Sequence, residues 1–266
     1  MKNEYIPFYS KILDIVEHTE HEHTFRMAYS GDVRPGQFFE VSLPKVGEAP
    51  ISVSGIEEGI IDLTIRKVGK VTDQIFEQLH GDHLFLRGPY GNGFDLDLFK
   101  GKELLVVAGG TGLSPVRGVV DYFAKNPDDC QSITLVAGFK SPADVLFLAD
   151  QDRWRDTINI VLTVDALDCD PGDMVCEVGM VTEHLPNLRI EHYEEAVAIV
   201  VGPPVMMHFT CLQLLQLGFK EENIWVSQER KMCCGLGKCG HCKINESYVC
   251  VDGPVYNYSE ARHMFD

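Results

Sequence analysis

The chain has 266 residues, of which 23 are Lys or Arg and 40 are Asp or Glu, so its formal net charge is −17 at pH 7. This charge excludes a general binder of nucleic acids or anionic membranes and favours small molecules or other proteins as partners. The sequence has neither a signal-peptide pattern nor an apolar run of roughly 18 residues, so we expect a cytoplasmic protein whose thiols stay reduced.

The first part of the chain, to about residue 98, consists of short segments with strand-like alternation or β-branched residues, separated by turns. Short strands at close spacing predict a small antiparallel β-barrel. A helix is predicted over residues 70–79, where Val71, Ile75, Phe76 and Leu79 recur at helical spacing. The predicted strands cover residues 9–19, 24–30, 36–44, 51–57, 60–69 and 82–88.

Two further stretches of this part are ambiguous. His18, His21 and His23 could form a metal site, but they stand among acidic residues, and a solvated hairpin turn is the better interpretation. The glycine-rich stretch 87–95 resembles a phosphate loop, yet it lacks the Gly-Lys-Ser/Thr of a P-loop. By itself it predicts a hairpin turn.

From about Lys102 the pattern changes to long apolar strands that alternate with helices. Continuous apolar runs are typical of parallel strands that are covered on both faces. Alternation of such strands with helices predicts a doubly wound α/β domain. The predicted strands are 103–110, 132–139, 158–165 and 195–204, and the main helices are 114–125 and 205–218.

Two glycine turns follow strands of this predicted sheet. Gly109, Gly110 and Gly112 lead into a helix near Ser114, whose free N–H groups could bind a phosphate, although a simple tight turn has the same pattern. A second turn, at Gly202, ends the last predicted strand. Because ligands of doubly wound sheets bind at the carboxyl ends of the strands, the two turns together favour a dinucleotide.

The last forty or so residues carry a dense group of cysteines. Cys234, Cys239, Cys242 and Cys250 follow the pattern Cys-x4-Cys-x2-Cys-x7-Cys, and its first three members have the spacing of plant-type [2Fe-2S] ferredoxins. Zinc is the main alternative, although it commonly uses two separated cysteine pairs. Cys233 adjoins Cys234 and is the less suitable ligand. We expect the scattered thiols to be ordinary ones: Cys130, Cys169, Cys176 and Cys211.

The order of barrel, nucleotide domain and cysteine tail resembles the ferredoxin reductase superfamily. More narrowly, the chain resembles the family of B subunits of anaerobic sulfite reductase, through the stretches VGEAPISVS, IRKVGKVT, LLVVAGGTG, VVGPP, ERKMCCGLGKCGHCK and YVCVDGPVYNY. Relatives with the same layout are the electron-transfer subunit of dihydroorotate dehydrogenase B and the gamma subunit of some sulfur-reducing hydrogenases. The resemblance implies an FAD-binding barrel over residues 1–100, an NAD(P)-binding domain over 101–225 and a [2Fe-2S] module over 226–266.

The resemblance also implies where the cofactors bind. The flavin motif of the superfamily, Arg-x-Tyr-Ser, falls on residues 49–52, where Ala49 and Ile51 replace the arginine and the aromatic residue. Arg66 is then the candidate for the flavin pyrophosphate, with the amides that follow it. The implied FAD residues are Pro50, Ile51, Ser52, Ile65, Arg66, Val71 and Thr72. The implied NAD(H) residues are Gly110, Thr111, Gly112, Gly202, Pro203 and Pro204, and the cluster ligands are Cys234, Cys239, Cys242 and Cys250.

The implied function is an electron-transfer subunit that passes electrons from NADH through FAD and the cluster to iron–sulfur and sirohaem subunits that reduce sulfite. The same internal chain would serve a dihydroorotate dehydrogenase or a sulfur-reducing hydrogenase. Selection between NADH and NADPH is expected just after the strand 132–139, where Lys140 and Ser141 could meet a 2′-phosphate and Asp144 would oppose one. The resemblance implies NADH. A rival from another class is a zinc-stabilised binding protein that senses a nucleotide. No acid, base or nucleophile for catalysis is predicted.

Overall fold

The computed structural model describes residues 3–77 and 81–264, and the chain divides into two compact units. The first unit contains the chain to Phe94 together with Gln228–Val255, and the second contains Asp95–Ser227 and the remaining residues from Tyr256. The cysteine-bearing segment, which the sequence suggested as a third module, therefore belongs to the same unit as the first strands. None of the described helices is long and apolar enough to cross a membrane.

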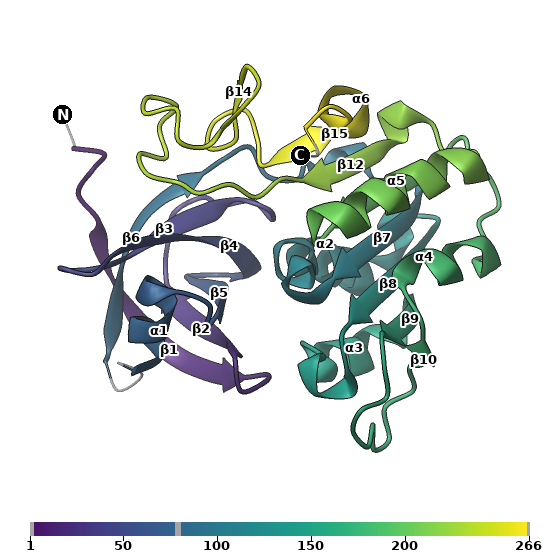
Figure 1. The fold of residues 1–266 in the computed structure, drawn as a ribbon, viewed down its shortest axis with the longest axis horizontal. Helices are drawn as coiled ribbons and strands as arrows, with labels where there is room; N and C mark the ends of the chain where they lie inside the picture. Colours follow the sequence, from purple (N-terminus) through teal and green to yellow (C-terminus); the bar gives the residue numbers. More distant parts are fainter. Residues whose placement is uncertain (1–2, 78–80, 265–266) are drawn as a thin grey trace. The chain divides into compact units, whose positions relative to one another are not determined.

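A closed antiparallel barrel forms the first unit, as predicted (Figure 1). Its strands are paired in the order β1-β2-β5-β4-β3-β6. Alternate residues point inward and form an apolar core that includes Phe25, Phe39, Leu63 and Ile65. The strands are β1 (Phe8–Glu17), β2 (Glu22–Ala28), β3 (Phe38–Leu43), β4 (Gly47–Glu57), β5 (Ile60–Arg66) and β6 (His83–Tyr90).

Helix α1 (Lys70–Glu77) lies against the barrel core through Ile75 and Phe76. The predicted helical residue Leu79 lies outside the described residues. His23 is buried, and its ring lies 4.6 Å from that of Phe76, between centroids. The expectation of a solvated turn is therefore wrong for His23, because strand alternation turns this residue into the barrel.

The stretch 87–95 is not a hairpin turn. Among the described residues, β6 pairs with β1 and β3 alone, and after it the chain makes contacts with the cysteine-bearing segment instead of returning as a strand. The amide of Asn92 donates to the carbonyl of Gly253 (2.7 Å), and its side-chain amide donates to the carbonyl of Val255 (2.8 Å). These bonds join the end of the barrel to the end of that segment, which contains β13 (Lys243–Ile244) and β14 (Ser247–Tyr248).

A seven-stranded sheet forms the second unit, in the order β10-β9-β8-β7-β11-β12-β15. The pairings from β10 to β12 are parallel, which confirms the predicted doubly wound domain. The strands are β7 (Glu103–Gly109), β8 (Ser132–Phe139), β9 (Asn159–Val164), β10 (Glu177–Val178), β11 (Val197–Val201), β12 (Ile224–Ser227) and β15 (Val255–Asn257). The helices are α2 (Leu113–Lys125), α3 (Leu148–Trp154), α4 (Val181–His184), α5 (Pro204–Leu217) and α6 (Tyr258–Ala261).

The strand order of this sheet reverses between β7 and β11. From β7 the chain proceeds through β8 and β9 toward one edge, and it then returns to place β11 on the other side of β7. Such a reversal is the point at which doubly wound sheets bind their ligands, beyond the carboxyl ends of the strands. Both predicted glycine turns follow these two strands.

Candidate cofactor sites

The segment from Cys233 to Cys250, here called the cysteine loop, contains residues with a left-handed backbone. Gly235, Gly237 and Gly240 have φ values of 71°, 66° and 75°, which side chains rarely tolerate. At Gly235 a Cβ atom would also lie 2.6 Å from the ring of Tyr90 on β6, so only glycine fits there. The loop is thereby held close to the barrel strand.

The backbone of this loop donates hydrogen bonds to cysteine sulfurs. The amides of Leu236 and Lys238 lie 3.3 and 3.4 Å from Sγ of Cys234, and the amide of Gly237 lies 3.2 Å from Sγ of Cys250. Amide donors stabilise negative charge on sulfur, and such bonds are one of the means by which proteins tune iron–sulfur centres. The donor set therefore fits a group held by thiolates.

The four predicted ligands form two pairs. Cys234 is hydrogen-bonded to Cys239, and Cys250 to Cys242. In the described chain, no three His, Cys, Asp or Glu side chains converge as the ligands of one metal ion would. The two thiol contacts bring four candidate metal ligands together on one loop.

The two pairs differ in their electrostatics. Although burial raises the pKa of Cys234, the amides of Leu236 and Lys238 lower it to about 6. Burial and the hydrogen bond with Cys242 raise the pKa of Cys250 to about 12. Since metal ligation requires thiolates, the charge of a bound metal would favour the deprotonation of Cys250.

Cys233 differs from its neighbour in orientation. Its thiol is exposed, whereas Cys234 is buried. The carbonyl of Cys233 instead accepts a hydrogen bond of 2.8 Å from Nη2 of Arg87. Among the remaining cysteines, burial raises the pKa of Cys211 to about 12, which makes this thiol unreactive at neutral pH.

The predicted flavin residues lie on β4, on β5 and at the start of α1. Ser52 is half-buried, whereas Ile51 and Ile65 point into the barrel core. Nε of Arg66 lies 3.2 Å from Oε1 of Glu22, and the Arg66 side chain is 43% exposed. Arg66 thus pairs with a carboxylate, while its exposure leaves the guanidinium accessible to a further anion.

The start of α1 is stabilised by Thr72. Its hydroxyl accepts hydrogen bonds from the amides of Val68 and Gly69, both at 3.0 Å, and donates to the carbonyl of Gly69. The side chain of Thr72 is therefore used within the turn, and only the backbone amides of Val71 and Thr72 remain to act on a phosphate. The role of these two amides at a flavin phosphate stays a prediction.

The two glycine turns of the sheet lie side by side. A Cβ atom at Gly112 would lie 2.6 Å from the carbonyl oxygen of Val201 and 2.8 Å from Cα of Gly202. Gly110 has a φ of 55°, and apart from its chain neighbours no heavy atom of the described residues lies within 4 Å of the position of its Cβ. The structure therefore brings together the predicted residues Gly110, Thr111 and Gly112 with Gly202, Pro203 and Pro204, at the reversal point of the sheet.

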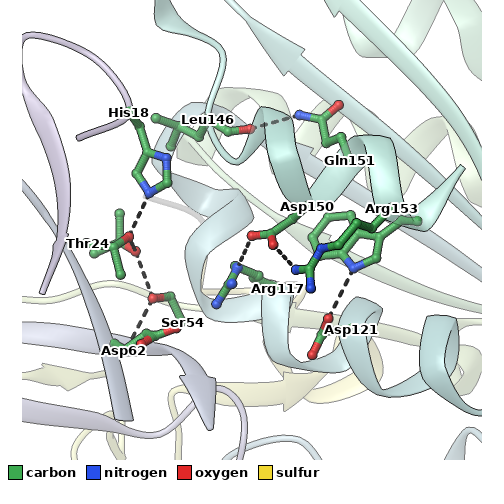
Figure 2. A network of polar contacts seen from close by, with 12 residues as sticks. His18, Thr24, Ser54, Asp62, Arg117, Asp121, Leu146, Asp150, Gln151 and Arg153 are labelled. Atoms are coloured by element: carbon green, nitrogen blue, oxygen red, sulfur yellow. Dashed lines mark hydrogen bonds and ion pairs between the residues drawn. The ribbon is translucent and has the colours of Figure 1, made fainter. Parts of the chain in front are cut away.

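Polar contacts hold the helix that follows β8 in place, and Figure 2 shows them. Nε of Arg117 on α2 lies 2.7 Å from Oδ2 of Asp150 on α3, and Arg153 pairs with the same carboxylate. Between β8 and α3, the hydroxyl of Ser141 donates to Oδ2 of Asp144 at 2.9 Å. Ser141, which could have met a 2′-phosphate, is thus engaged with a carboxylate.

The figure also shows a separate network on the barrel. The hydroxyls of Thr24 and Thr64 lie 2.7 Å apart, and Thr64 donates to Ser54 at 2.7 Å. His18 contacts the hydroxyl of Thr24 at 2.7 Å. The hydroxyl contacts join β2, β5 and β4, and the ring of His18 is the end of this network.

Several residues around the cysteine loop were missed by the sequence reasoning: Glu40, Glu48, Arg87 and Tyr90. Arg87 is only 3% exposed and pairs with Glu48 through two contacts, Nη2 to Oε2 at 2.6 Å and Nε to Oε1 at 3.2 Å. Glu40 is buried opposite Arg87 in the sheet, and burial raises its pKa to about 7. The sequence feature that could have pointed to this group is Arg87 itself, an arginine within the mostly apolar strand β6.

Comparisons with known proteins agree with this geometry. Residues 106–212 match the oxidoreductase NAD-binding domain family, and residues 229–262 match the iron–sulfur cluster binding domain of dihydroorotate dehydrogenase B. The structure of an NADH-dependent reduced ferredoxin-NADP oxidoreductase aligns with a TM-score of 0.77 and 24% identity, over 100% of this chain and 94% of the other. The fold is that of ferredoxin reductases with a C-terminal iron–sulfur domain.

Two relatives define the group more narrowly. The gamma subunit of sulfhydrogenase 1 from Pyrococcus furiosus is 35% identical over 93% of this chain and 89% of its own length. A probable electron-transfer subunit of dihydroorotate dehydrogenase B (NAD(+)) from Thermoplasma volcanium is 32% identical over 94% of this chain and 89% of its own. The chain belongs to the family of sulfhydrogenase gamma subunits and dihydroorotate dehydrogenase B electron-transfer subunits, and is an NAD(P)H-dependent oxidoreductase. The narrower expectation of a sulfite reductase B subunit is not supported by these relatives.

Proposed function

We propose that this protein is the electron-transfer subunit of a larger complex and passes electrons from NADH through FAD and a [2Fe-2S] cluster to a partner subunit. The observation that carries the proposal is the pairing of four cysteines on a loop that the barrel holds in place. When bound, the flavin accepts two electrons as a hydride and releases them singly to a one-electron cluster. The residues of the chain bind and orient these groups.

Each cysteine pair would hold one iron atom. Cys234 and Cys239 form one pair, and Cys242 and Cys250 form the other. The x4 spacing of the first pair and the x2 step to the second match the plant-type pattern. This agreement between spacing and pairing supports two irons over a single zinc.

The nucleotide residues act through the backbone. The turn between the C-terminal end of β7 and α2 would hold the pyrophosphate at Gly110, Thr111 and Gly112, since the glycines permit close approach of the backbone to a phosphate. Gly202, Pro203 and Pro204 would border the nicotinamide. In the barrel, Pro50 and Ser52 would face the flavin ring, and Arg66 with the amides of Val71 and Thr72 would meet its pyrophosphate. Ile51 and Ile65 would pack beneath them in the barrel core.

A partner of the hydrogenase or dihydroorotate dehydrogenase type is the favoured electron acceptor, because relatives with these names align over most of the chain. A sulfite reductase partner with a sirohaem is the second candidate, because only sequence motifs favour it. To decide, we would purify the native complex from the source cells and assay NADH-dependent reduction of sulfur, orotate and sulfite. We expect sulfur or orotate to be reduced, and NADH-dependent sulfite reduction alone would reverse the order.

Asp144 is expected to select NADH over NADPH. Asp144 follows β8, and its carboxylate accepts a hydrogen bond from the hydroxyl of Ser141. A 2′-phosphate bound beside this carboxylate would be repelled by its negative charge. The Asp144→Ala variant should therefore raise kcat/KM for NADPH relative to NADH, measured by anaerobic flavin reduction. Asp128→Ala, which changes an exposed carboxylate before β8, is the control and should leave the ratio unchanged. An unchanged ratio in Asp144→Ala would contradict this assignment.

A further inference from the structure

Arg87 connects the barrel to the cysteine loop through the backbone of that loop. Its Nη1 donates to the carbonyl of Cys234 at 2.6 Å, and its Nη2 donates to the carbonyl of Cys233 at 2.8 Å. Nη1 also lies 2.8 Å from the hydroxyl of Tyr90. One buried guanidinium thus binds both carbonyls that precede the glycine-rich part of the loop.

These two bonds determine how the loop begins. In a trans peptide the carbonyl and the following N–H point in opposite directions. Carbonyls that face Arg87 therefore turn the next amides away from the guanidinium. The chain then continues into the amides of Leu236, Gly237 and Lys238, which donate to cysteine sulfurs.

Glu48 fixes the orientation of Arg87. The two side chains form a two-contact ion pair, and the hydroxyl of Ser42 donates to Oε1 of Glu48 at 2.6 Å. Bidentate pairing of arginine with a carboxylate restricts the guanidinium to one plane. Burial alone would raise the pKa of Glu48, but its bonds with Arg87 and Ser42 lower it, so the carboxylate is charged at neutral pH.

The pair also joins two functional parts of the first unit. Glu48 lies on β4, two residues before Pro50, while Arg87 lies on β6 and contacts the cysteine loop. Strand β3 lies between β4 and β6, and its residue Glu40 is opposite Pro50 on β4 and Arg87 on β6. The proposed flavin strand and the proposed cluster loop are thus linked by one ion pair.

We propose that Arg87, oriented by Glu48, is a positioning residue that holds the cluster loop and raises the reduction potential of the cluster. This inference rests on the proposed function. Reduction adds one electron to the cluster and changes no covalent bond, so a nearby positive charge stabilises the reduced state and a nearby negative charge opposes it. Arg87 and Glu48 should therefore have opposite effects on the potential.

The test uses the intact protein with its cofactors and compares Arg87→Met, Arg87→Lys and Glu48→Gln. The midpoint potential of the cluster is measured by redox titration with electron paramagnetic resonance, and iron and sulfide are assayed on the same samples. Arg26→Met is the matched control, because Arg26 is also a paired arginine of the barrel but its partners are Glu57 and Asp62 on β4 and β5. Hydrogen exchange of the amides 236–238 provides a second readout.

We expect Arg87→Met to lower the potential and to accelerate exchange of these amides. Arg87→Lys, which retains the charge but cannot bind two carbonyls and a carboxylate in one plane, should show a smaller shift in potential. Glu48→Gln should raise the potential, and Arg26→Met should change neither readout. If Arg87→Met does not fold, Arg87→Lys and Glu48→Gln still test the proposal, because the first should lower the potential of the cluster and the second should raise it.

Two results would overturn the proposal. Equal potentials in all variants would show that Arg87 does not act on the cluster, and shifts of the same sign in Arg87 and Glu48 variants would indicate general loosening of the loop. Both results leave the proposed function intact. A wild-type protein that contains flavin but no iron or sulfide would instead contradict the proposed function itself, together with this inference.

Discussion

Glu40 is a carboxylate that the barrel buries completely. Its side chain is 0% exposed, and neither carboxylate oxygen has a hydrogen-bond partner among the described residues. Burial raises its pKa to about 7, and the charge of Arg87 offsets only part of this effect. The folded protein therefore binds this proton more tightly than the unfolded chain does.

The consequence is a pH-dependent stability. The contribution of the protonated Glu40 is present at low pH and is lost as the pH rises through the folded pKa of about 7. Glu40→Gln should thus increase the free energy of unfolding above that pH by about 1–3 kcal/mol, with little effect below the ordinary carboxyl pKa of 4.5, where Glu40 is protonated in both states. Denaturant unfolding at both pH values measures this, and an equal effect at both would contradict the assignment.

The glycines of the first nucleotide turn differ in what they tolerate. Alanine at Gly112 would collide with backbone atoms of Val201 and Gly202, which cannot move without displacing the second turn. Alanine at Gly110 meets no atom and incurs only the strain of a left-handed residue, about 1 kcal/mol.

We therefore expect Gly112→Ala to weaken NADH binding by about tenfold or more, which corresponds to ~1.4 kcal/mol. Gly110→Ala serves as the comparison and should have the smaller effect on both stability and affinity. Equilibrium binding and thermal unfolding of the two variants measure these quantities. Equal effects of the two substitutions would show that the contact between the turns is not responsible.

At the scale of elements, helix α3 is held to α2 by two carboxylates: Asp150, and Asp121, which accepts a hydrogen bond of 3.2 Å from Nε1 of Trp154. Asp150 is paired with Arg117 and Arg153, and although burial raises its pKa, the hydrogen bond with Arg117 leaves the pKa below its usual value. The stability it contributes is present above the unfolded pKa and is lost as the pH falls through the folded value.

Asp150→Asn should reduce the free energy of unfolding at neutral pH by about 1–3 kcal/mol, because it leaves the half-buried Arg117 without its charged partner. The cost should shrink as the solution is acidified toward the point at which the wild-type carboxylate protonates. Lys125→Gln changes an exposed residue at the end of α2 and should have little effect. A cost independent of pH would argue against the ion pair as its source.

The elements that the sequence predicted correctly are those with a local signal. The alternation of the barrel strands and the apolar runs of the sheet led to boundaries within a few residues of those observed. Helix α3 was missed because it is short and begins after Phe147, whose φ of 57° has no sequence signature outside glycine.

The contacts that were missed join residues far apart in sequence. Arg87 and the carbonyl of Cys234 are separated by 147 positions, and Asn92 and Val255 by 163. No periodicity reports on such pairs, since they depend on the closure of the barrel and on the return of the chain to it. For the same reason the stretch 87–95 was taken for a hairpin turn.

At the scale of the whole molecule, the final segment of the chain completes the unit formed by the first. Gln228–Val255 packs with the barrel, and the amide of Gln228 donates to the carbonyl of Pro254 at 2.8 Å. The cysteine loop and the proposed flavin strands thus share one compact unit. This arrangement suits direct electron transfer between two groups bound within that unit.

The central claim is an internal electron path from NADH to a [2Fe-2S] cluster. We would add NADH to the anaerobically purified protein and record its visible and electron paramagnetic resonance spectra, with flavin, iron and sulfide assayed on the same sample. The account predicts bleaching of flavin and cluster bands and the signal of one unpaired electron per reduced cluster. Cys239→Ser should lose that signal, and Cys169→Ser, which changes an exposed thiol outside the loop, should retain it. A colourless, zinc-containing protein, or one whose spectra do not respond to NADH, would contradict the account.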